Sequence, residues 1–406
     1  MAFNKGSFLI TCAAMLAVAA GGAQAQGKAE VGVTSTEVKL GQTMPYSGPN
    51  SAYGIEGRVQ TAYFKMINDK GGINGRKVNL ISLDDSYSPP KTVEQTRKLV
   101  EVENVMGIVG TLGTAGNMAI RPYLNSKKVP QVLVLTGAML GDGTTAPWTT
   151  TFLPPYAADG KIFAAHILKN FPNARIGTIS QNDDLGREFI RGLKEGLGSK
   201  AASLIVKEAT YDTTDTSTDS QILSLQASGA DTLMIAGVAK FPAQSLRKTY
   251  DIGWKPQVMI FGAGNSIKTS LEPAGLERSI GVLTSVWLKT PGDASWVNDK
   301  GMQEYLSFMK KYMPGETAED QLPAIGYTTA QIIAHVIAQC GNDLSRENFA
   351  KQATAISNPP MDLLLPGVSL NSSPTVRNPV SQMQMARFDG KAWIPLGPVL
   401  TADSTK

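Results

Sequence analysis

Cysteine and histidine are almost absent from this sequence of 406 residues. It holds two cysteines, Cys12 and Cys340, and two histidines, His166 and His335. Both histidines lie in stretches with helical periodicity, and neither has a second ligand at metal-binding spacing, so we expect no metal site. A serine–histidine–acid triad is disfavoured as well, because no G-x-S-x-G elbow is present. The scarcity of these residues predicts a protein that is not an enzyme and that holds no metal or other cofactor.

Charged residues are few and scattered. The chain carries 38 lysines and arginines against 34 aspartates and glutamates, a formal net charge of +4. No run of basic residues is present, so we expect neither nucleic acid nor an anionic membrane surface as a partner. Beyond the N-terminal segment, no uninterrupted apolar run is long enough to cross a bilayer as a helix.

The first 25 residues have the pattern of a secretory signal peptide. Lys5 supplies the positive charge, residues 8–20 form a short apolar core, and Ala23-Gln24-Ala25 is a cleavage sequence. Because Cys12 lies inside the apolar core, lipid attachment there is not expected. Cleavage would leave about 380 residues, which suggests two domains of ordinary size. Cys340 would then be the only thiol, which excludes an internal disulfide.

Short apolar strands alternate with amphipathic helices along most of the chain. This alternation predicts parallel sheets covered by helices, and it occurs twice at similar length, so we expect two related α/β lobes. The end of the chain differs: two long helices, a shorter helix, a proline-rich irregular stretch and a hairpin around Asp389-Gly390. The predicted strands are 37–45, 78–83, 105–110, 132–135, 175–180, 203–208, 232–236, 257–261 and 281–286. The predicted C-terminal helices are 295–312, 319–339 and 346–354, followed by irregular chain over 359–378 and hairpin strands over 382–388 and 392–396.

Glycine-rich and hydroxyl-rich turns follow two of the buried strands. Strand 105–110 leads into Thr-Leu-Gly-Thr-Ala-Gly at 111–116, and strand 132–135 leads into Thr136-Gly137-Ala138. In a parallel sheet both turns lie at the carboxyl ends of strands, where α/β folds hold ligands. Backbone amides at the start of the next helix favour an anion, and the threonines add hydroxyl donors. The pattern indicates a cradle for a carboxylate, although such turns often serve only to reverse the chain; it matches neither nucleotide-binding fingerprint.

Two pairs of adjacent aspartates follow predicted strands. Asp84-Asp85 precedes the helix that begins near Pro89, and Asp183-Asp184 precedes the helix that begins near Gly186. Acid–base catalysis would need the pairs to meet across the lobes. We expect them instead to cap the turn and the helix that follow them.

Four stretches resemble the type I periplasmic substrate-binding proteins of ABC importers, in particular the Leu/Ile/Val-binding-protein-like subfamily. The resemblance covers about 38–400. The run Asn-Asp-Lys-Gly-Gly-Ile-Asn-Gly after an amphipathic helix is the most specific of the four. The stretches are Ser47-Gly48-Pro49 with Tyr53-Gly54, 68–75, Val129-Pro130-Gln131 with 136–138, and 181–186.

The resemblance implies two Rossmann-like lobes with parallel-sheet cores, joined by a hinge of three chain crossings that closes on a solute. It also implies a periplasmic location, a small-molecule solute and an inner-membrane ABC permease as partners, and a monomer. By position, lobe 1 is expected over 31–149 and 286–357, and lobe 2 over 154–281 and 370–400. The crossings are expected near 148–156, 279–285 and 356–366.

The resemblance also places the ligand site. Tyr53 matches a tyrosine that lines the cleft, and the two turns of lobe 1 match loops that hold a ligand carboxylate. Lobe 2 contributes the loops around Leu185, Ala239–Phe241 and Gly262–Gly264. The expected ligand-binding residues are Tyr53, Thr111, Leu112, Thr114, Thr136, Gly137, Ala138, Met139, Asp184, Leu185, Phe241 and Ala263.

The expected solute follows from what these loops lack. Amino-acid binders commonly place an acid at the position of Gly262-Ala263-Gly264 to pair the ligand ammonium, and a buried ammonium without a partner costs several kcal/mol. Asp183 or Asp184 would have to replace that acid. We therefore favour an aromatic or aliphatic organic acid over a branched-chain amino acid, which remains the alternative. A periplasmic sensor of the same fold is a second alternative, and a hydrolase is disfavoured by the missing histidine chemistry.

Overall fold

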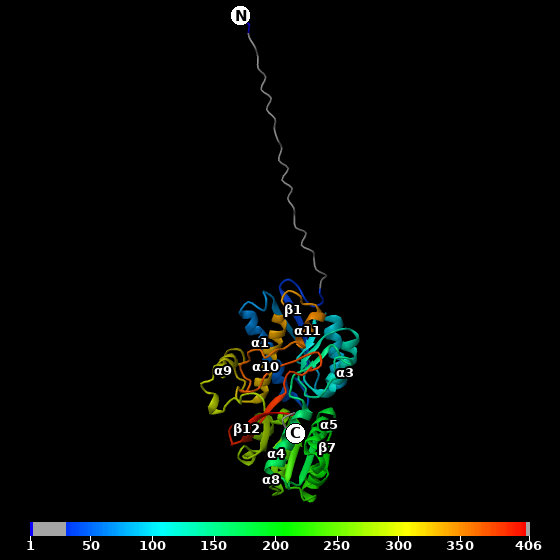
Figure 1. The fold of residues 1–406 in the computed structure, drawn as a ribbon, viewed down its shortest axis with the longest axis vertical. Coiled ribbons are helices and arrows are strands. Elements are labelled where there is room, and N and C mark those ends of the chain that lie inside the picture. The colour runs from blue at the N-terminus through cyan, green and yellow to red at the C-terminus, as the bar shows by residue number, and fades with distance from the viewer. Residues whose placement is uncertain (3–29, 403–406) are drawn as a thin grey trace.

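The computed structural model describes residues 1–2 and 30–402, so the predicted signal peptide lies almost entirely outside the described residues. Two bodies lie one above the other in Figure 1, the upper one with β1, α1, α3, α10 and α11 and the lower one with α4, α5, α8 and β7. Each is built on one sheet, with five strands in one and seven in the other. This confirms the predicted class, two α/β lobes with parallel-sheet cores.

The first lobe contains the five-stranded sheet, in the order β2-β1-β3-β4-β5, with every pair parallel. Its short central strands are wholly buried and, apart from Gln131, apolar, as expected where helices cover both faces. The strands are β1 (Glu37–Met44), β2 (Lys77–Asp84), β3 (Gly107–Val109), β4 (Gln131–Val134) and β5 (Thr149–Thr151). The helices are α1 (Gly54–Asp69), α2 (Pro89–Arg97) and α3 (Thr114–Ser126).

Three later helices return to this lobe. Helix α10 packs along α1 and α11 packs on β4, so a distant part of the sequence completes the first core. The helices are α9 (Lys300–Tyr312), α10 (Gln321–Gln339) and α11 (Arg346–Ala353). The predicted start of α9 at 295 is wrong, because the Asp299 side chain accepts a hydrogen bond from the Met302 amide and caps the helix there.

The second lobe contains the seven-stranded sheet, in the order β12-β11-β10-β9-β8-β6-β7. Strands β6 to β10 run parallel, and the C-terminal hairpin is antiparallel, as its sequence predicted. The strands are β6 (Ile176–Gln181), β7 (Ile205–Tyr211), β8 (Thr232–Ala236), β9 (Gln257–Ile260), β10 (Leu283–Val286), β11 (Gln382–Phe388) and β12 (Trp393–Thr401). The helices are α4 (Tyr156–Asn170), α5 (Asp184–Leu197), α6 (Ala201–Leu204), α7 (Asp219–Ala227) and α8 (Lys240–Asp251).

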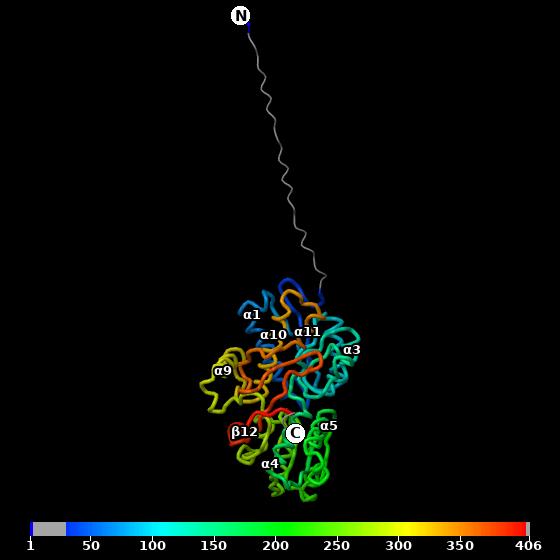
Figure 2. Tube along the Cα trace, viewed as in Figure 1, coloured from blue at the N-terminus to red at the C-terminus, as the bar shows by residue number. Residues whose placement is uncertain are grey.

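The chain passes between the two sheets three times: after β5, after β10 and before β11. Figure 2 shows the last passage as the orange-to-red tube that descends into the lower body. The position expected for the second crossing, 279–285, needs correction. Most of β10 falls in that range and pairs with β9 and β11, so the chain leaves the second sheet only after Val286. The remaining lobe boundaries stay predictions.

The predicted capping role is confirmed for Asp84, Asp85 and Asp183, whereas Asp184 lies in the first turn of α5 and pairs with Arg187. The Asp183 side chain accepts from the Leu185 amide at 2.9 Å at the start of α5. Asp84 accepts from the Ser86 amide at 3.0 Å, and Asp85 accepts from the Tyr87 amide at 2.9 Å, in the turn before α2. Within residues 30–402, no helix has both the length and the apolar character needed to cross a membrane.

Candidate ligand-binding site

An apolar cavity lies between the two lobes. It holds about 420 Å³ of space free of atoms, a figure that includes the solvent-filled space at its mouth. Side chains of both lobes line it, and no lysine, arginine or histidine is among them. The lining residues from the first lobe are Asn50, Tyr53, Glu56, Tyr87, Leu112, Gly113, Leu135, Leu322 and Ile325. The remaining lining residues are Leu153, Tyr156, Leu185, Val238 and Ala263.

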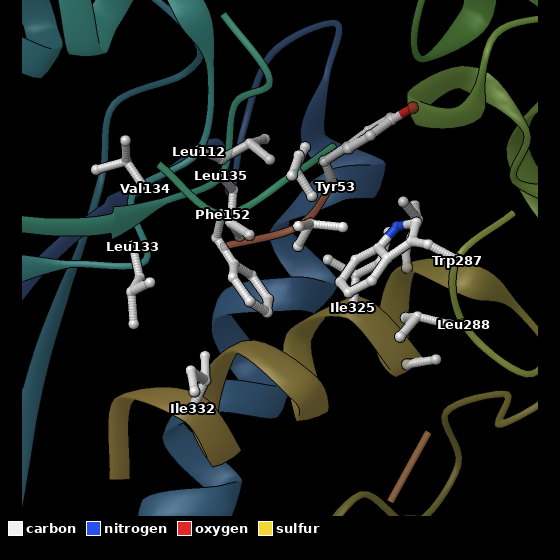
Figure 3. Close-up of a cluster of buried hydrophobic side chains, with 14 of the residues drawn as sticks. Tyr53, Leu112, Leu133, Val134, Leu135, Phe152, Trp287, Leu288, Ile325 and Ile332 are labelled. Atoms are coloured by element: carbon white, nitrogen blue, oxygen red, sulfur yellow. The ribbon is translucent and has the colours of Figure 1, made fainter. Parts of the chain in front are cut away.

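Tyr53 joins the lobes across this cavity. It ends a short 3-10 turn directly before α1, and Figure 3 shows its hydroxyl directed away from Leu112 and Ile325, toward the second lobe. The hydroxyl donates to the Ala263 carbonyl at 3.0 Å and accepts from the Ala239 amide at 3.4 Å. Burial raises the pKa of Tyr53 well above its usual value, so the phenol stays protonated and remains a donor.

Two further contacts hold the lobes together. The Met139 amide, in the loop after β4, donates to the Glu188 carboxylate of α5 at 3.0 and 3.2 Å. On the other side, Asp320 at the start of α10 accepts from the Ser266 hydroxyl at 2.9 and 3.1 Å. One cluster of buried apolar side chains also runs from β1 through Trp287 into α5. The structure therefore shows the closed arrangement of the cleft.

The predicted carboxylate cradle lies at the first-lobe wall of the cavity. Leu112 and Gly113 line the cavity directly. Thr111, Thr114 and Thr136 are fully buried behind them, and the hydroxyls of Thr114 and Thr136 lie 2.8 Å apart. Helix α3 begins at Thr114, so its free amides face this wall.

Gly113 is required at this wall by geometry. Its φ is +103°, and a Cβ there would come within 2.8 Å of the Tyr87 ring. The glycine therefore lets the Tyr87 ring press against the backbone of the turn.

The structure gathers Tyr53, Leu112, Leu185 and Ala263 around the cavity and places other predicted residues elsewhere. Met139 is 71% exposed, and it lies with Gly137 and Ala138 at a separate surface hollow. Phe241 is fully buried and stacks on Tyr211 with ring centroids 4.0 Å apart. Asp184 pairs with Arg187 at 2.9 Å on the surface of α5. None of these five side chains lines the cavity.

Sequence reasoning missed a carboxyl group in the cavity wall. Glu56, in the first turn of α1, is 2% exposed, and its Oε2 atom has no hydrogen-bond partner. A signal was available, because Glu56 lies three residues before Val59 and therefore on the apolar face of the helix. Also missed were Asn50, Tyr87, Leu135, Leu153, Tyr156, Val238, Leu322 and Ile325.

A second buried carboxyl lies behind the glycine loop of the second lobe. Asp159 of α4 accepts from the Gly262 amide at 2.9 Å, and burial raises its pKa to about 6. It lines a smaller neighbouring hollow that shares Leu153, Tyr156, Ala263 and Ile325 with the main cavity. The loop 262–264 has no acid of its own, but the cleft as a whole is not free of acids.

The family model described as "Periplasmic binding protein" matches residues 37–392. The chain belongs to the periplasmic binding protein family. This family consists of binding proteins rather than enzymes, which confirms that expectation from the sequence. It also confirms the predicted resemblance to the type I, Leu/Ile/Val-binding-protein-like class.

The relatives of this periplasmic binding protein are distant in sequence and similar in fold. It is 23% identical over 321 residues to Leu/Ile/Val-binding protein homolog 7 of Brucella suis, covering 75% of this chain and 77% of that protein. A branched chain amino acid ABC transporter protein from Thermus thermophilus with bound valine superposes with a TM-score of 0.81 at 15% identity, covering 92% and 98% of the two chains. A fatty acid ABC transporter substrate-binding protein from Thermomonospora curvata gives 0.77 at 19% identity, covering 93% and 96%.

Proposed function

We propose that this protein is the solute receptor of an ABC importer for a small carboxylate-bearing solute with an apolar body, either aromatic or aliphatic. It binds the solute in the cleft between the lobes in the periplasm, as a monomer, and delivers it to an inner-membrane permease. The observation that carries the proposal is the closed interlobe cavity, with Tyr53 joining the two lobes across it.

The cavity walls support an apolar solute with one polar end. Leucine, valine, isoleucine and alanine side chains make up most of the lining, and their burial against an apolar body contributes about 25 cal/mol per Å². The turn at Leu112 and Gly113, directly before α3, is where a carboxylate would meet free backbone amides. The two solved neighbours named above are titled for valine and for fatty acids, which both carry a carboxylate on an apolar body.

A branched-chain amino acid remains the second candidate, and one observation favours it. The loop 262–264 lacks the acid that would pair an ammonium, but Glu56 and Asp159 bring buried carboxyl groups to the cleft from other elements. The absence of an acid from that loop is therefore a weaker argument against an amino group than the sequence alone suggested.

A thermal-shift screen tests the proposal. The protein lacking residues 1–25 is unfolded and refolded to remove bound solute, and then mixed with aromatic acids, aliphatic acids, branched-chain amino acids, sugars and cations. A solute at 100 times its Kd stabilises the folded state by about 2.7 kcal/mol, which gives a clear rise in Tm. A rise with carboxylic acids supports the proposal, and a rise with leucine or valine only supports the second candidate. No rise with any carboxylate-bearing compound, together with a rise for sugars or cations, would overturn it.

A further inference from the structure

Glu56 carries a buried carboxyl group, and one of its two oxygen atoms has no hydrogen-bond partner in the fold. It lines the interlobe cavity, it is 2% exposed, and its Oε2 atom makes no hydrogen bond. Leaving such a group unpaired costs stability, so a residue of this kind calls for an explanation. A leucine would fill the same space without that cost, and the position of Glu56 in a ligand cavity suggests that the missing partner is the solute.

The surroundings of Glu56 favour the uncharged acid. Asp320, at the start of the neighbouring helix α10, is the charged group that acts on it, and its effect is repulsive. The phenols of Tyr53 and Tyr156 line the same cavity and remain protonated, because burial raises both of their pKa values. The nearest basic residue along α1, Arg58, pairs with Glu316 at 3.3 Å on the surface. Burial and Asp320 together raise the pKa of Glu56 well above its usual value.

The backbone holds Glu56 at this position. Helix α10 crosses α1 at Gly326, where a Cβ would come within 2.7 Å of the Glu56 carbonyl oxygen. Glycine at 326 therefore allows the two helices to touch, and this contact fixes the main chain of Glu56 beside the cavity. Leu322 and Ile325, from the same part of α10, form the adjoining cavity wall.

We propose that Glu56 is a specificity-determining residue that binds the solute as an uncharged carboxylic acid and donates its proton in a hydrogen bond to an oxygen of the solute. This inference rests on the function proposed above and extends it to the chemistry of the solute. A solute with a carbonyl or carboxylate oxygen at this point accepts the hydrogen bond. A solute with an ammonium there would require Glu56 to ionise close to Asp320, in a wall without any basic side chain.

Three solutes with the same carbon skeleton provide the test. 4-Methyl-2-oxopentanoate carries an oxygen acceptor beside the carboxylate, and leucine carries an ammonium there. 4-Methylpentanoate has no polar group at that position. An aromatic set of phenylpyruvate, 3-phenylpropanoate and phenylalanine is used in parallel. Titration calorimetry of the wild-type protein and of Glu56→Gln gives the Kd of each solute between pH 5.5 and 9. Asp159→Asn is the matched control, because Asp159 is another buried acid near the cavity, and burial raises its pKa to about 6.

We expect wild-type affinity for the oxo acid to be highest at low pH and to fall by up to about tenfold per pH unit above the pKa of Glu56, since only the protonated acid donates. Glutamine keeps a donor of the same shape and cannot ionise. Glu56→Gln should therefore bind the oxo acid within about threefold of the wild type at low pH and show no fall at high pH, whereas Asp159→Asn should keep the wild-type fall.

Binding of an ammonium by Glu56 would overturn this inference and would leave the proposed function standing. If Glu56 pairs an ammonium, leucine or phenylalanine binds tightest, and Glu56→Gln weakens that binding by more than tenfold. Wild-type binding of the oxo acids that is no tighter than binding of the matching unsubstituted acids also overturns it, and this comparison depends neither on the pKa of Glu56 nor on how the variant folds. A fall in affinity at high pH that persists in Glu56→Gln overturns it as well. Failure of all six carboxylates to bind, followed by stabilisation by a different class of solute, would instead refute the proposed function.

Discussion

Removal of the Tyr53 hydroxyl should open the cleft. In the closed arrangement this hydroxyl donates to the Ala263 carbonyl at 3.0 Å, and the longer contact from the Ala239 amide, at 3.4 Å, adds less. In Tyr53→Phe the carbonyl loses its partner only when the lobes are closed, because water reaches it when they are apart. A buried carbonyl left without a partner costs about 1–3 kcal/mol. The closed-to-open ratio, and with it the affinity for solute, should fall by roughly 5- to 150-fold.

Fluorescence energy transfer between the lobes measures this shift directly. Lys127 at the end of α3 and Lys200 before α6 are exposed, one on each lobe, and can be replaced by cysteines for labelling. In the protein lacking residues 1–25 the remaining native thiol is Cys340, which is buried and should not take up dye. Tyr53→Phe should show a smaller closed fraction at every solute concentration. An unchanged closed fraction and an unchanged Kd would refute the assignment of Tyr53 as an interlobe contact.

Three further predictions concern other parts of the molecule. Burial raises the pKa of the Cys340 thiol to about 12, so the native protein should not react with iodoacetamide at pH 8 and the unfolded protein should; rapid native labelling would contradict this. In Gly326→Ala the new Cβ meets backbone atoms of Glu56, so the free energy of unfolding should fall by about 1–3 kcal/mol in urea titration, and an unchanged midpoint would show that the helices adjust freely. In Glu188→Gln the side-chain oxygen still accepts the hydrogen bond from the Met139 amide, but the negative charge of the carboxylate is lost. Because Met139 is exposed, solute affinity should fall less than about fivefold by calorimetry, and a larger loss would mean that this contact dominates closure.

Much of the fold could be predicted because its signals are local. The helix start after Asp183 and the hairpin around Asp389-Gly390 each depend on a few neighbouring residues, and the structure confirms both. The second crossing was misplaced because the sequence of β10 does not say which sheet it joins. That choice depends on pairing with β11, which comes much later in the chain.

The site was only partly predictable for a related reason. The glycine-rich turn at Leu112 is found from its own neighbourhood, and the cleft residue Tyr53 is found from the family resemblance. Glu56, by contrast, has only its place on the apolar face of α1 as a local signal, and its burial depends on α10, which is far away in the sequence. Phe241 was expected in the cleft, but it packs on Tyr211 inside the second lobe, a contact that no local pattern reveals.

The central claim is that the cavity between Tyr53, Leu112, Tyr156 and Ala263 is where a carboxylate-bearing solute binds. A crystal structure of the refolded protein with the tightest-binding acid of the screen tests it most directly. The account predicts the solute inside this cavity between closed lobes, with its carboxylate at the turn before α3. A solute bound outside the cavity, or one whose carboxylate faces away from that turn, would contradict it.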